Sequence, residues 1–581
     1  MKKLLLSIAL VSGAFWSTAQ VITAIQFPPS IMGNKEFTWA DPSGGDWAST
    51  DFLVPGVYIE DTLILVNDGT PGNNATYGNL LAEEGCFASP AGAYAGKIAV
   101  LRRNTCEFGK KAFEAQQAGA IGVIIINRDP EVIEMGGGVD GINVTIPVVM
   151  INSNDGAAIL AEMLNGPVVA LIGNKTGLYA NDAGITKSST LISKSAGVTS
   201  QLSMNAAEFS FDMGTHLYNY GSNDQANIMV TAMVDGPSGN VYSETVGPIS
   251  LNGGDSVEII PAGAFEFPTF SLASYPAGEY TVSYEVDLGV ADEYDADNAV
   301  VSTFNVQDSI FSLARLDPAT GLTIADNGYR PSGSTGYFTQ CINMRDANAS
   351  RIGVEGLYFS ALATGVDLSG EEMVLSLYRW DDAFADLSVT PTFDALTEVA
   401  NGFYYFPSDL QGETVYGEFT TPVLLTDNDR YLACVQTFNT ELFLGFDTKT
   451  DYIWNEAYYL QPLTIIDDNG TYYASGFGAD VVPAIGAKIF NAAELGINEE
   501  PSIEGSAYPN PAVDVVTIAI NAKGTATLNV TDLAGRTVKS MTVTMNEGKS
   551  TVNVADLTSG AYIFNVVFED GKSSQFNVIK K

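Results

Sequence analysis

The clearest folding signal in the chain is a helical spacing of small and apolar residues that leads straight into an apolar run. Phe108, Ala112 and Ala115 recur at the spacing of one helix face, and Gly119 follows as a natural helix end. The next segment, "IGVIIIN", has no polar side chain before its last residue, which is typical of a strand buried on both faces of a sheet. We therefore predict a small α/β domain over residues 20–175.

Two further apolar runs, "IPVVMI" and "VVALIG", continue this alternation of strand and helix. Asn154 or Asp155 is predicted to cap the helix that lies between them. Ligand contacts are expected from the loop at residues 129–144, with its adjacent glycines Gly136 to Gly138, because loops of α/β domains carry most binding residues. The first helix is expected to be scaffold, with the side chains of both its lysines, Lys110 and Lys111, free in solvent.

The rest of the chain reads as short strands of period two, separated by Gly, Asn and Pro. We predict an immunoglobulin-like antiparallel sandwich at residues 205–307, a jelly-roll-like sandwich at 308–495 and a third sandwich at 496–581. The Ser/Thr/Gly-rich residues 176–204 are predicted to be a linker or a loosely attached first strand. The expected fold class is thus multi-domain and mainly β.

The first nineteen residues, "MKKLLLSIALVSGAFWSTA", have the pattern of a signal peptide. Lys2 and Lys3 precede a short apolar run, and small residues follow it as a cleavage site. No later segment has the roughly 18 uninterrupted apolar residues that a membrane-spanning helix needs. The chain is therefore expected to leave the cytoplasm and to lack a transmembrane segment.

The net charge of −41 argues against nucleic acid and anionic membranes as partners, because both are themselves negative. Carboxylates are also the ligands that calcium prefers. Asp292, Asp295, Asp297 and Asn298 lie within seven residues of one another and are the predicted calcium ligands. A solvated acidic turn between two strands is the alternative, since the full spacing of an EF-hand loop is missing. No other cofactor is predicted.

Four cysteines in an exported chain can form disulfides, and three pairings are open to them. Cys86 and Cys106 share one predicted domain, and Cys341 and Cys434 share another, so we predict a bridge within each domain. A zinc site is not expected, because the sequence has no C-x-x-C and its one histidine is distant.

The same histidine, His216, argues against a peptidase. A zinc peptidase needs two histidines, and a serine hydrolase of the usual kind needs a G-x-S-x-G elbow, which is absent. Phosphate-binding and dinucleotide-binding loops are absent too. No catalytic residue is predicted. The alternative is a secreted hydrolase, a glycosidase or a peptidase-associated one, with its site in residues 308–495. Two carboxylates there could act on a glycosidic bond.

Two aromatic clusters offer flat faces on which sugar rings could stack. The first is "GFYYF", with Phe403 to Phe406, and the second is "DYIWNEAYYL", with Trp454, Tyr458 and Tyr459. Alternation along a strand sends about half of such side chains into the core. Core packing is therefore the alternative interpretation of both clusters.

The first domain resembles the protease-associated (PA) domain. The similarity lies in "GKIAVLRRNTCEFGKKAFEAQQAGAIGVIIIN" and "TIPVVMINSNDGAAI", with Asn104 where the family usually has glycine. The resemblance implies an interaction module that binds or positions proteins or peptides. Residues 205–307, which end in "YPAGEYTVSYEVDLGVADEYDADNAVVSTFNV", resemble CARDB-type immunoglobulin-like adhesion modules.

The tail resembles the C-terminal sorting domain of the type IX secretion system. The resemblance implies a Bacteroidetes-type bacterium, the type IX machinery as partner, export through the periplasm to the surface or medium, and cell-surface attachment after the domain is removed. The residues that carry it are Tyr508, Pro509, Asn510, Pro511, Asp532, Gly535, Arg536, Gly560, Lys580 and Lys581.

These observations together predict an exported, non-catalytic binding protein. The PA-like domain would contact a protein or peptide, and the sandwiches would serve adhesion or bind a ligand such as a glycan.

Overall fold

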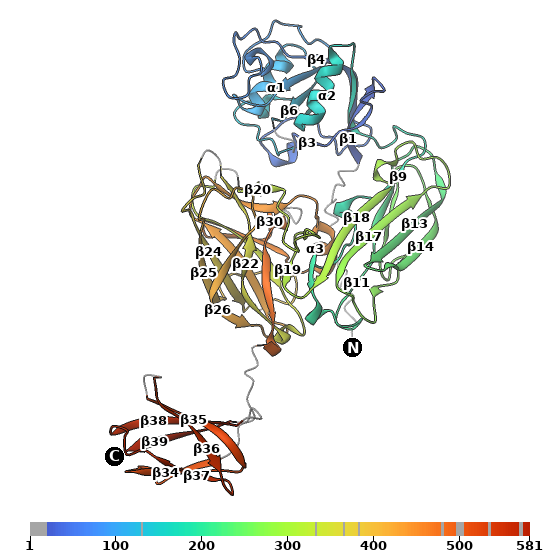
Figure 1. The fold of residues 1–581 in the computed structure, drawn as a ribbon. Helices are drawn as coiled ribbons and strands as arrows, with labels where there is room; N and C mark the ends of the chain where they lie inside the picture. The colour runs from blue at the N-terminus through green and yellow to red at the C-terminus, as the bar shows by residue number, and fades with distance from the viewer. Residues whose placement is uncertain are drawn as a thin grey trace, which may run out of the picture. The chain divides into compact units, whose positions relative to one another are not determined.

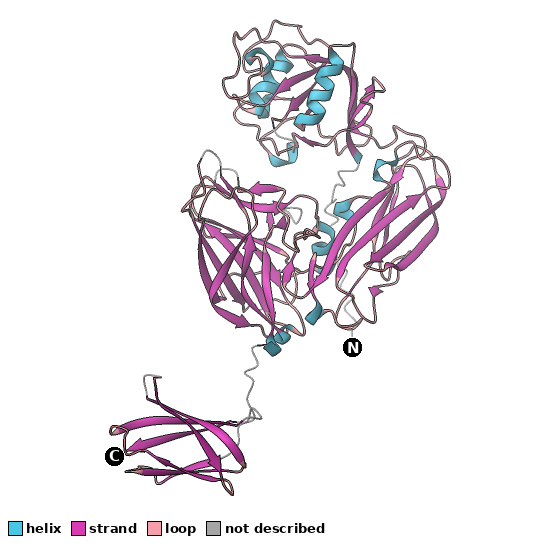
Figure 2. Ribbon diagram, in the orientation of Figure 1, coloured by secondary structure: helices cyan, strands magenta, loops and turns pink. Residues whose placement is uncertain are grey.

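The computed structural model divides the chain into two compact units, residues 1–489 and residues 490–581 (Figure 1). Strands dominate both units, and helices gather in the N-terminal part (Figure 2). The chain is thus multi-domain and mainly β. The signal peptide predicted at residues 1–19 lies outside the described residues. The structure describes residues 20–128, 132–331, 334–363, 366–381, 384–477, 482–494, 505–532, 536–568 and 573–581.

The N-terminal domain is built on an eight-stranded sheet. Its four central strands are parallel, and antiparallel strands complete both edges. The strands, in spatial order, are β2 (Gly33–Asn34), β1 (Val21–Phe27), β8 (Val169–Asn174), β4 (Tyr58–Leu65), β5 (Ile98–Arg102), β6 (Gly122–Ile126), β7 (Val148–Ile151) and β3 (Phe37–Trp39).

Helices α1 (Phe108–Gln117) and α2 (Ser153–Met163) cover opposite faces of this sheet. Alternate residues of β5 and β6 pack against α1 in one core and against Ile159 of α2 in the other. Gly119 follows α1 with φ +94°, so the predicted helix end is confirmed. The predicted cap of α2 is wrong, because the side chain of Asn152 caps it by accepting from the Asp155 N–H.

The next region forms a sandwich whose larger sheet continues into the following region. Nine strands make this continuous sheet, in the order β14 (Gly239–Leu251), β13 (Gln225–Gly236), β17 (Gly278–Asp287), β18 (Ala299–Gln307), β10 (Gly197–Thr199), β19 (Ile310–Ser312), β32 (Gly486–Asn491), β22 (Ile352–Phe359) and β26 (Val415–Leu424). The strands opposite its first half are β9 (Ala183–Gly184), β11 (Ser210–Phe211), β12 (Thr215–Asn219), β15 (Ser256–Ile259) and β16 (Phe270–Ser271).

The predicted linker at residues 176–204 is instead an integral part of this sandwich. Its strand β10 lies parallel to β18 and antiparallel to β19, and so joins the two halves of the nine-stranded sheet. Ile185, Leu191 and Val198 are buried. The prediction of a loose segment is wrong. The segment has few apolar residues among many polar ones in the sequence, but each of these three apolar side chains fills a position in the core.

A second sandwich encloses the largest apolar core of the chain's first unit. Its outer sheet consists of β25 (Leu396–Tyr405), β24 (Glu372–Trp380), β27 (Arg430–Thr437), β21 (Phe338–Met344), β29 (Thr464–Asp468) and β30 (Thr471–Phe477). The opposite side combines β19, β32, β22 and β26 with β20 (Asn327–Tyr329), β23 (Ala361–Ala363), β28 (Leu442–Asp447) and β31 (Val482–Pro483). Helix α3 (Ile453–Tyr459) lies beside the first sandwich (Figure 1).

The second unit is a separate small sandwich with its own core. One sheet has three strands and the other has four. They are β33 (Gly505–Tyr508), β34 (Val515–Ile520) and β37 (Lys549–Asn553), and β36 (Thr537–Met545), β35 (Gly524–Asp532), β38 (Gly560–Phe568) and β39 (Ser573–Lys580).

Candidate functional site

The carboxyl ends of parallel strands are the usual binding edge of an α/β sheet, and polar residues gather at this edge of the N-terminal domain. Arg103 follows β5, and its Nη1 donates to Oδ1 of Asn127, which follows β6, at 2.8 Å. Nη1 of the neighbouring Arg128 donates to the Tyr77 hydroxyl at 2.8 Å, and the Arg128 guanidinium lies 5.3 Å from the centre of the Tyr77 ring. The edge thus fixes the loop that contains Tyr77.

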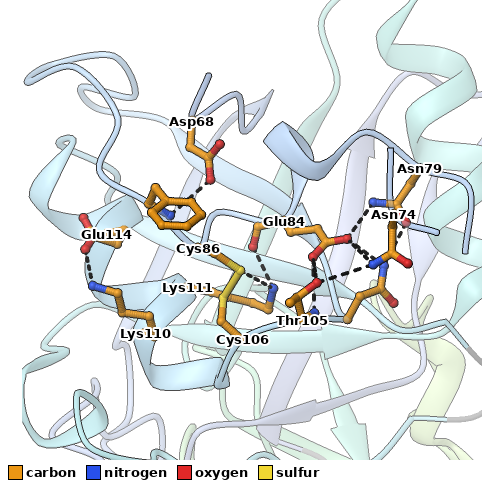
Figure 3. Close-up of a disulfide and its surroundings, with 12 residues drawn as sticks. Asp68, Asn74, Asn79, Glu84, Cys86, Thr105, Cys106, Lys110, Lys111 and Glu114 are labelled. Carbon is orange, nitrogen blue, oxygen red and sulfur yellow. Dashed lines mark hydrogen bonds and ion pairs between the residues drawn. A yellow bond between two sulfur atoms is a disulfide. The ribbon is translucent and has the colours of Figure 1, made fainter. Parts of the chain in front are cut away.

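A buried carboxylate organises this loop from inside (Figure 3). Glu84 accepts hydrogen bonds from Nδ2 of Asn74 at 2.8 Å and from Nδ2 of Asn79 at 3.0 Å. It also accepts from the Thr105 N–H at 3.2 Å and from the Thr105 hydroxyl. Burial alone would raise the pKa of Glu84, but these hydrogen bonds outweigh it and hold the pKa below its usual value. Glu84 is therefore a negatively charged carboxylate when it anchors the loop.

Lys111 of α1 lies under the same loop and is fully buried. Its Nζ donates to the backbone carbonyl of Glu84 at 2.8 Å and lies 3.7 Å from the sulfur of Cys86 (Figure 3). Burial lowers its pKa to about 8, although the carboxylates of Glu84 and Asp68 oppose this shift. The prediction that both helix lysines reach solvent is wrong for Lys111. Lys110 is the outward one, and it pairs with Glu114 one turn along the helix.

The Cys86–Cys106 disulfide closes the loop, with 5.8 Å between the two Cα atoms. The predicted bridge is therefore present. The result is a loop fixed by a bridge, a buried cation and a buried anion, while its outer side chains remain in solvent. Tyr77, Leu80 and Phe87 are 47%, 51% and 62% exposed.

The glycine-rich loop predicted for ligand contacts is packed tightly at its base. Residues 129–131 lie outside the described residues. A Cβ on Gly137 would lie 2.1 Å from the backbone oxygen of Asp46, so the close approach of two chain segments explains this glycine. The Val139 N–H donates to Glu107 at 3.2 Å. Val139 and Ile142 are exposed at the tip.

The four predicted calcium ligands have other partners or stand apart. Asp297 forms an ion pair with Lys175, with Nζ 2.8 Å from Oδ2. Asp292 accepts from two backbone N–H groups, those of Tyr294 and Ala183. Asp295 is exposed, and Asn298 ends the short turn. No group of three Asp, Glu, His or Cys side chains suited to a metal occurs among the described residues, so we do not propose calcium here.

Lys175 is instead the centre of a buried ionic cluster that the sequence did not reveal. Its Nζ lies 2.7 and 2.9 Å from the two carboxylate oxygens of Asp182, and 4.3 and 4.0 Å from the ring centres of Tyr220 and Tyr294. Burial raises the pKa of Asp182 to about 7, against the pull of Lys175 and with help from Asp297. Two carboxylates thus share one cation, an arrangement that serves to fasten β9.

His216, on β12, lies between two hydroxyl groups. Its Nε2 is 3.0 Å from the Ser256 hydroxyl and its Nδ1 is 3.0 Å from the Tyr218 hydroxyl, and the Tyr218 ring stacks on the imidazole. Burial lowers the pKa of His216 to about 4, so the ring is neutral near pH 7. The serine neighbour could not be foreseen, because it comes from another strand, 40 residues away.

The aromatic clusters follow strand alternation. Phe403 and Tyr405 are exposed, while Tyr404 packs against the core and Phe406 is buried. In the second cluster, Trp454 is half-buried on α3, and Tyr458 and Tyr459 contact Asp212 of the first sandwich. The second disulfide, Cys341–Cys434, links directly paired positions of β21 and β27.

The described residues that were predicted for sorting lie at strand ends of the second unit or in the turns that adjoin them. Asn510 accepts from the Ile579 N–H at 2.8 Å and donates to the Asn577 carbonyl at 2.7 Å, which ties the "YPNP" segment to the last strand. Asp532 and Arg536 form an ion pair at 2.7 Å. Gly535 lies outside the described residues. Tyr508, Gly560 and Lys580 lie at the ends of strands β33, β38 and β39, and Lys581 follows β39.

Comparisons with known proteins identify two parts of the chain. Residues 63–159 match the PA domain, and residues 506–580 match the secretion system C-terminal sorting domain. A comparison with curated proteins found no match. No described helix is long and apolar enough to cross a membrane.

Among solved structures, the chain is similar to an aminopeptidase from Aneurinibacillus sp. strain AM-1, with 21% identity over 27% of this chain and 30% of that chain and a TM-score of 0.18. The CARDB domain of a Pyrococcus furiosus protein, in complex with di-metal ions, gives 14% identity, coverages of 22% and 92% and a TM-score of 0.15. A Ruminococcus gnavus beta-glucuronidase gives 10% identity, coverages of 43% and 36% and a TM-score of 0.12.

The chain thus spans less than a third of the length of that aminopeptidase, and TM-scores this low carry no argument about its function. The two family matches are specific to their segments. The chain contains a PA domain and a type IX sorting domain, and the sorting domain marks it as a protein secreted to the cell surface or beyond.

Proposed function

We propose that this secreted protein binds a protein or peptide partner at the carboxyl edge of its PA domain and performs no catalysis itself. The observation that carries the proposal is the fixed loop with three exposed apolar side chains, Tyr77, Leu80 and Phe87. Exposed tyrosine and phenylalanine side chains supply much of the binding energy where proteins meet, because they bury a large area on contact.

The anchoring of this loop supports binding in a second way. A mobile loop loses conformational entropy when it binds, and that loss weakens the complex. Here Glu84, Lys111 and the Cys86–Cys106 bridge order the loop before any partner arrives. The loop can therefore present its apolar side chains at little further entropic cost.

The non-catalytic part of the proposal rests on the residues available. One histidine in the whole chain leaves no two-histidine zinc set. His216 contacts the hydroxyl groups of Ser256 and Tyr218, and among the described residues no hydrogen bond joins its ring to a carboxylate. A hydrolase that uses two carboxylates of the second sandwich is the competing function.

An array of peptides and glycans, run beside a broad hydrolase screen on the full-length protein, tests the proposal. We expect peptides to bind and Phe87→Ser or Tyr77→Ala to weaken them by about tenfold or more. Leu164→Ser is the matched control, because Leu164 is also exposed but follows the helix that runs back from the binding edge. Equal loss in the control, or turnover of any substrate in the screen, would contradict the proposal.

A further inference from the structure

A cavity of about 470 Å³ lies between the two sandwiches of the first unit. Volumes of this order are usual for sites that bind small molecules. The apolar part of its wall includes Leu202 and Phe209 from the first sandwich, and Ile352 and Leu425 from the second. The cavity therefore opens on the core of the second sandwich, in which Ile352 and Leu425 are buried.

Direct bonds between the sandwiches hold the walls of this cavity in place. Asn455 of α3 exchanges two hydrogen bonds with the backbone of Ile192, at 3.1 and 2.8 Å. Arg351 and Glu208 form an ion pair at 2.9 Å across the same junction. Strand β10 also joins the two halves of the nine-stranded sheet, so the two walls of the cavity are fixed relative to each other.

Lys194 is the unusual polar residue of the wall. Its ammonium lies 5.0 Å from the centre of the Tyr459 ring, and no hydrogen bond or ion pair joins it to another described residue. The side chain is open to solvent within the cavity, yet surrounding protein lowers its pKa through burial, against the opposing effect of Asp212 and Asp346. A cation that has a ring contact but no carboxylate in contact, and that lies beside an apolar wall, favours an anionic ligand group.

Four other charged residues line the cavity, and two carboxylates among them have partners of their own. Glu208 is paired with Arg351, and Asp346 accepts from the Asn348 N–H at 2.7 Å. Arg345 adds a second cation at the rim, and Asp429 adds a carboxylate. 

We propose that this cavity binds a small molecule that carries a carboxylate on an apolar body. The carboxylate would contact the Lys194 ammonium, and the apolar body would lie against Phe209, Ile352 and Leu425. This inference does not rest on the PA domain, so the peptide surface and the cavity can fail or hold separately.

Three matched probes test it by calorimetry on the full-length protein: octanoate, octanamide and 2-aminooctanoate. Octanamide keeps the shape and loses the charge, so we expect octanoate to bind about tenfold more tightly, as a charged hydrogen bond predicts. Lys194→Met should remove this preference and leave the binding of octanamide unchanged. Lys549→Met, which removes an exposed lysine of the second unit, is the control for net charge.

Ala347→Trp would narrow the cavity from an exposed rim position and should weaken all three probes. Melting temperatures equal to the unmodified protein would show that each variant is folded. Tighter binding of 2-aminooctanoate than of octanoate would support an amino acid or peptide end as ligand, and weaker binding would support a simple carboxylic acid. Absence of binding by octanoate, equal binding of octanoate and octanamide, or an unchanged preference in Lys194→Met would overturn the proposal.

Discussion

At the scale of single residues, Lys110 and Lys111 are neighbours in sequence with opposite roles. Lys111→Ala would leave the buried Glu84 carbonyl without its donor and open a void, so we expect the PA domain to lose about 3 kcal/mol of stability. Lys110→Ala removes only a surface pair and should change stability by less than about 0.5 kcal/mol. Thermal unfolding of the two variants checks this, and equal melting temperatures would contradict it.

Asp182 should make stability depend on pH. Its pKa of about 7 in the folded protein lies above its ordinary value of 3.8, so the folded state binds the proton more tightly. The stability from this group is therefore full below about pH 4 and is lost as the pH rises towards 7. As the pH rises over this range, we expect the free energy of unfolding to fall less in Asp182→Asn than in the unmodified protein.

Unfolding by denaturant at about pH 4.5 and about pH 7.5, near the two ends of this window, measures the difference. Asp295→Asn is the control, because it removes an exposed carboxylate from the same acidic turn. A pH slope that is the same in Asp182→Asn and in Asp295→Asn would show that Asp182 does not carry the effect.

Part of this residue-level picture can be predicted from the sequence. Both disulfides could be predicted, because each pair shares a domain. The burial of Lys111 was also accessible: it lies four residues before Ala115, and so on the helix face that packs against the sheet. The ion pair of Lys175 with Asp297 joins positions 122 residues apart, and no local pattern indicates such a contact.

At the scale of elements, β6 is predicted to tolerate no charge. Ile124 is fully buried in the middle of the sheet, between β5 and β7, so Ile124→Asp would bury an unpaired carboxylate and should unfold the PA domain. Ile142→Asp is the matched control at an exposed loop position and should leave the domain folded. Circular dichroism and limited proteolysis read the outcome, and a folded Ile124→Asp variant would be evidence against this view of the core.

Some secondary-structure elements of this chain can be predicted from the sequence and others cannot. Helix α1 could be predicted because its buried residues recur at helical spacing. Strand β6 could be predicted because it is an unbroken run of buried, mostly apolar residues. Strand β10 has only three residues, and its position depends on partners more than 100 residues later in the chain. Its role in joining two sheets follows from tertiary contacts, so a Ser/Thr-rich composition suggested a linker instead.

At the scale of the whole molecule, the chain joins a unit that contains the PA domain to a separate unit that contains the sorting domain. The PA and sorting domains were recognisable because their motifs keep fixed spacings over many residues. The continuity of the nine-stranded sheet and the cavity beside it were not, because they arise only where two sandwiches meet. The proposed peptide surface and the proposed cavity both lie in the first unit, so removal of the sorting domain would leave both intact.

This division leads to the last prediction. Deleting residues 499–581 removes every described strand of the small C-terminal sandwich and leaves β32, the strand nearest to the cut, complete. The first unit has its own cores, so the shortened protein should fold with an unchanged melting transition. Without the sorting domain it should accumulate in the periplasm, whereas residues 499–581 fused to an unrelated periplasmic protein should carry that protein outside. Cell fractionation distinguishes the compartments. If the shortened protein still reached the cell surface or the medium, the second unit would not be the export signal.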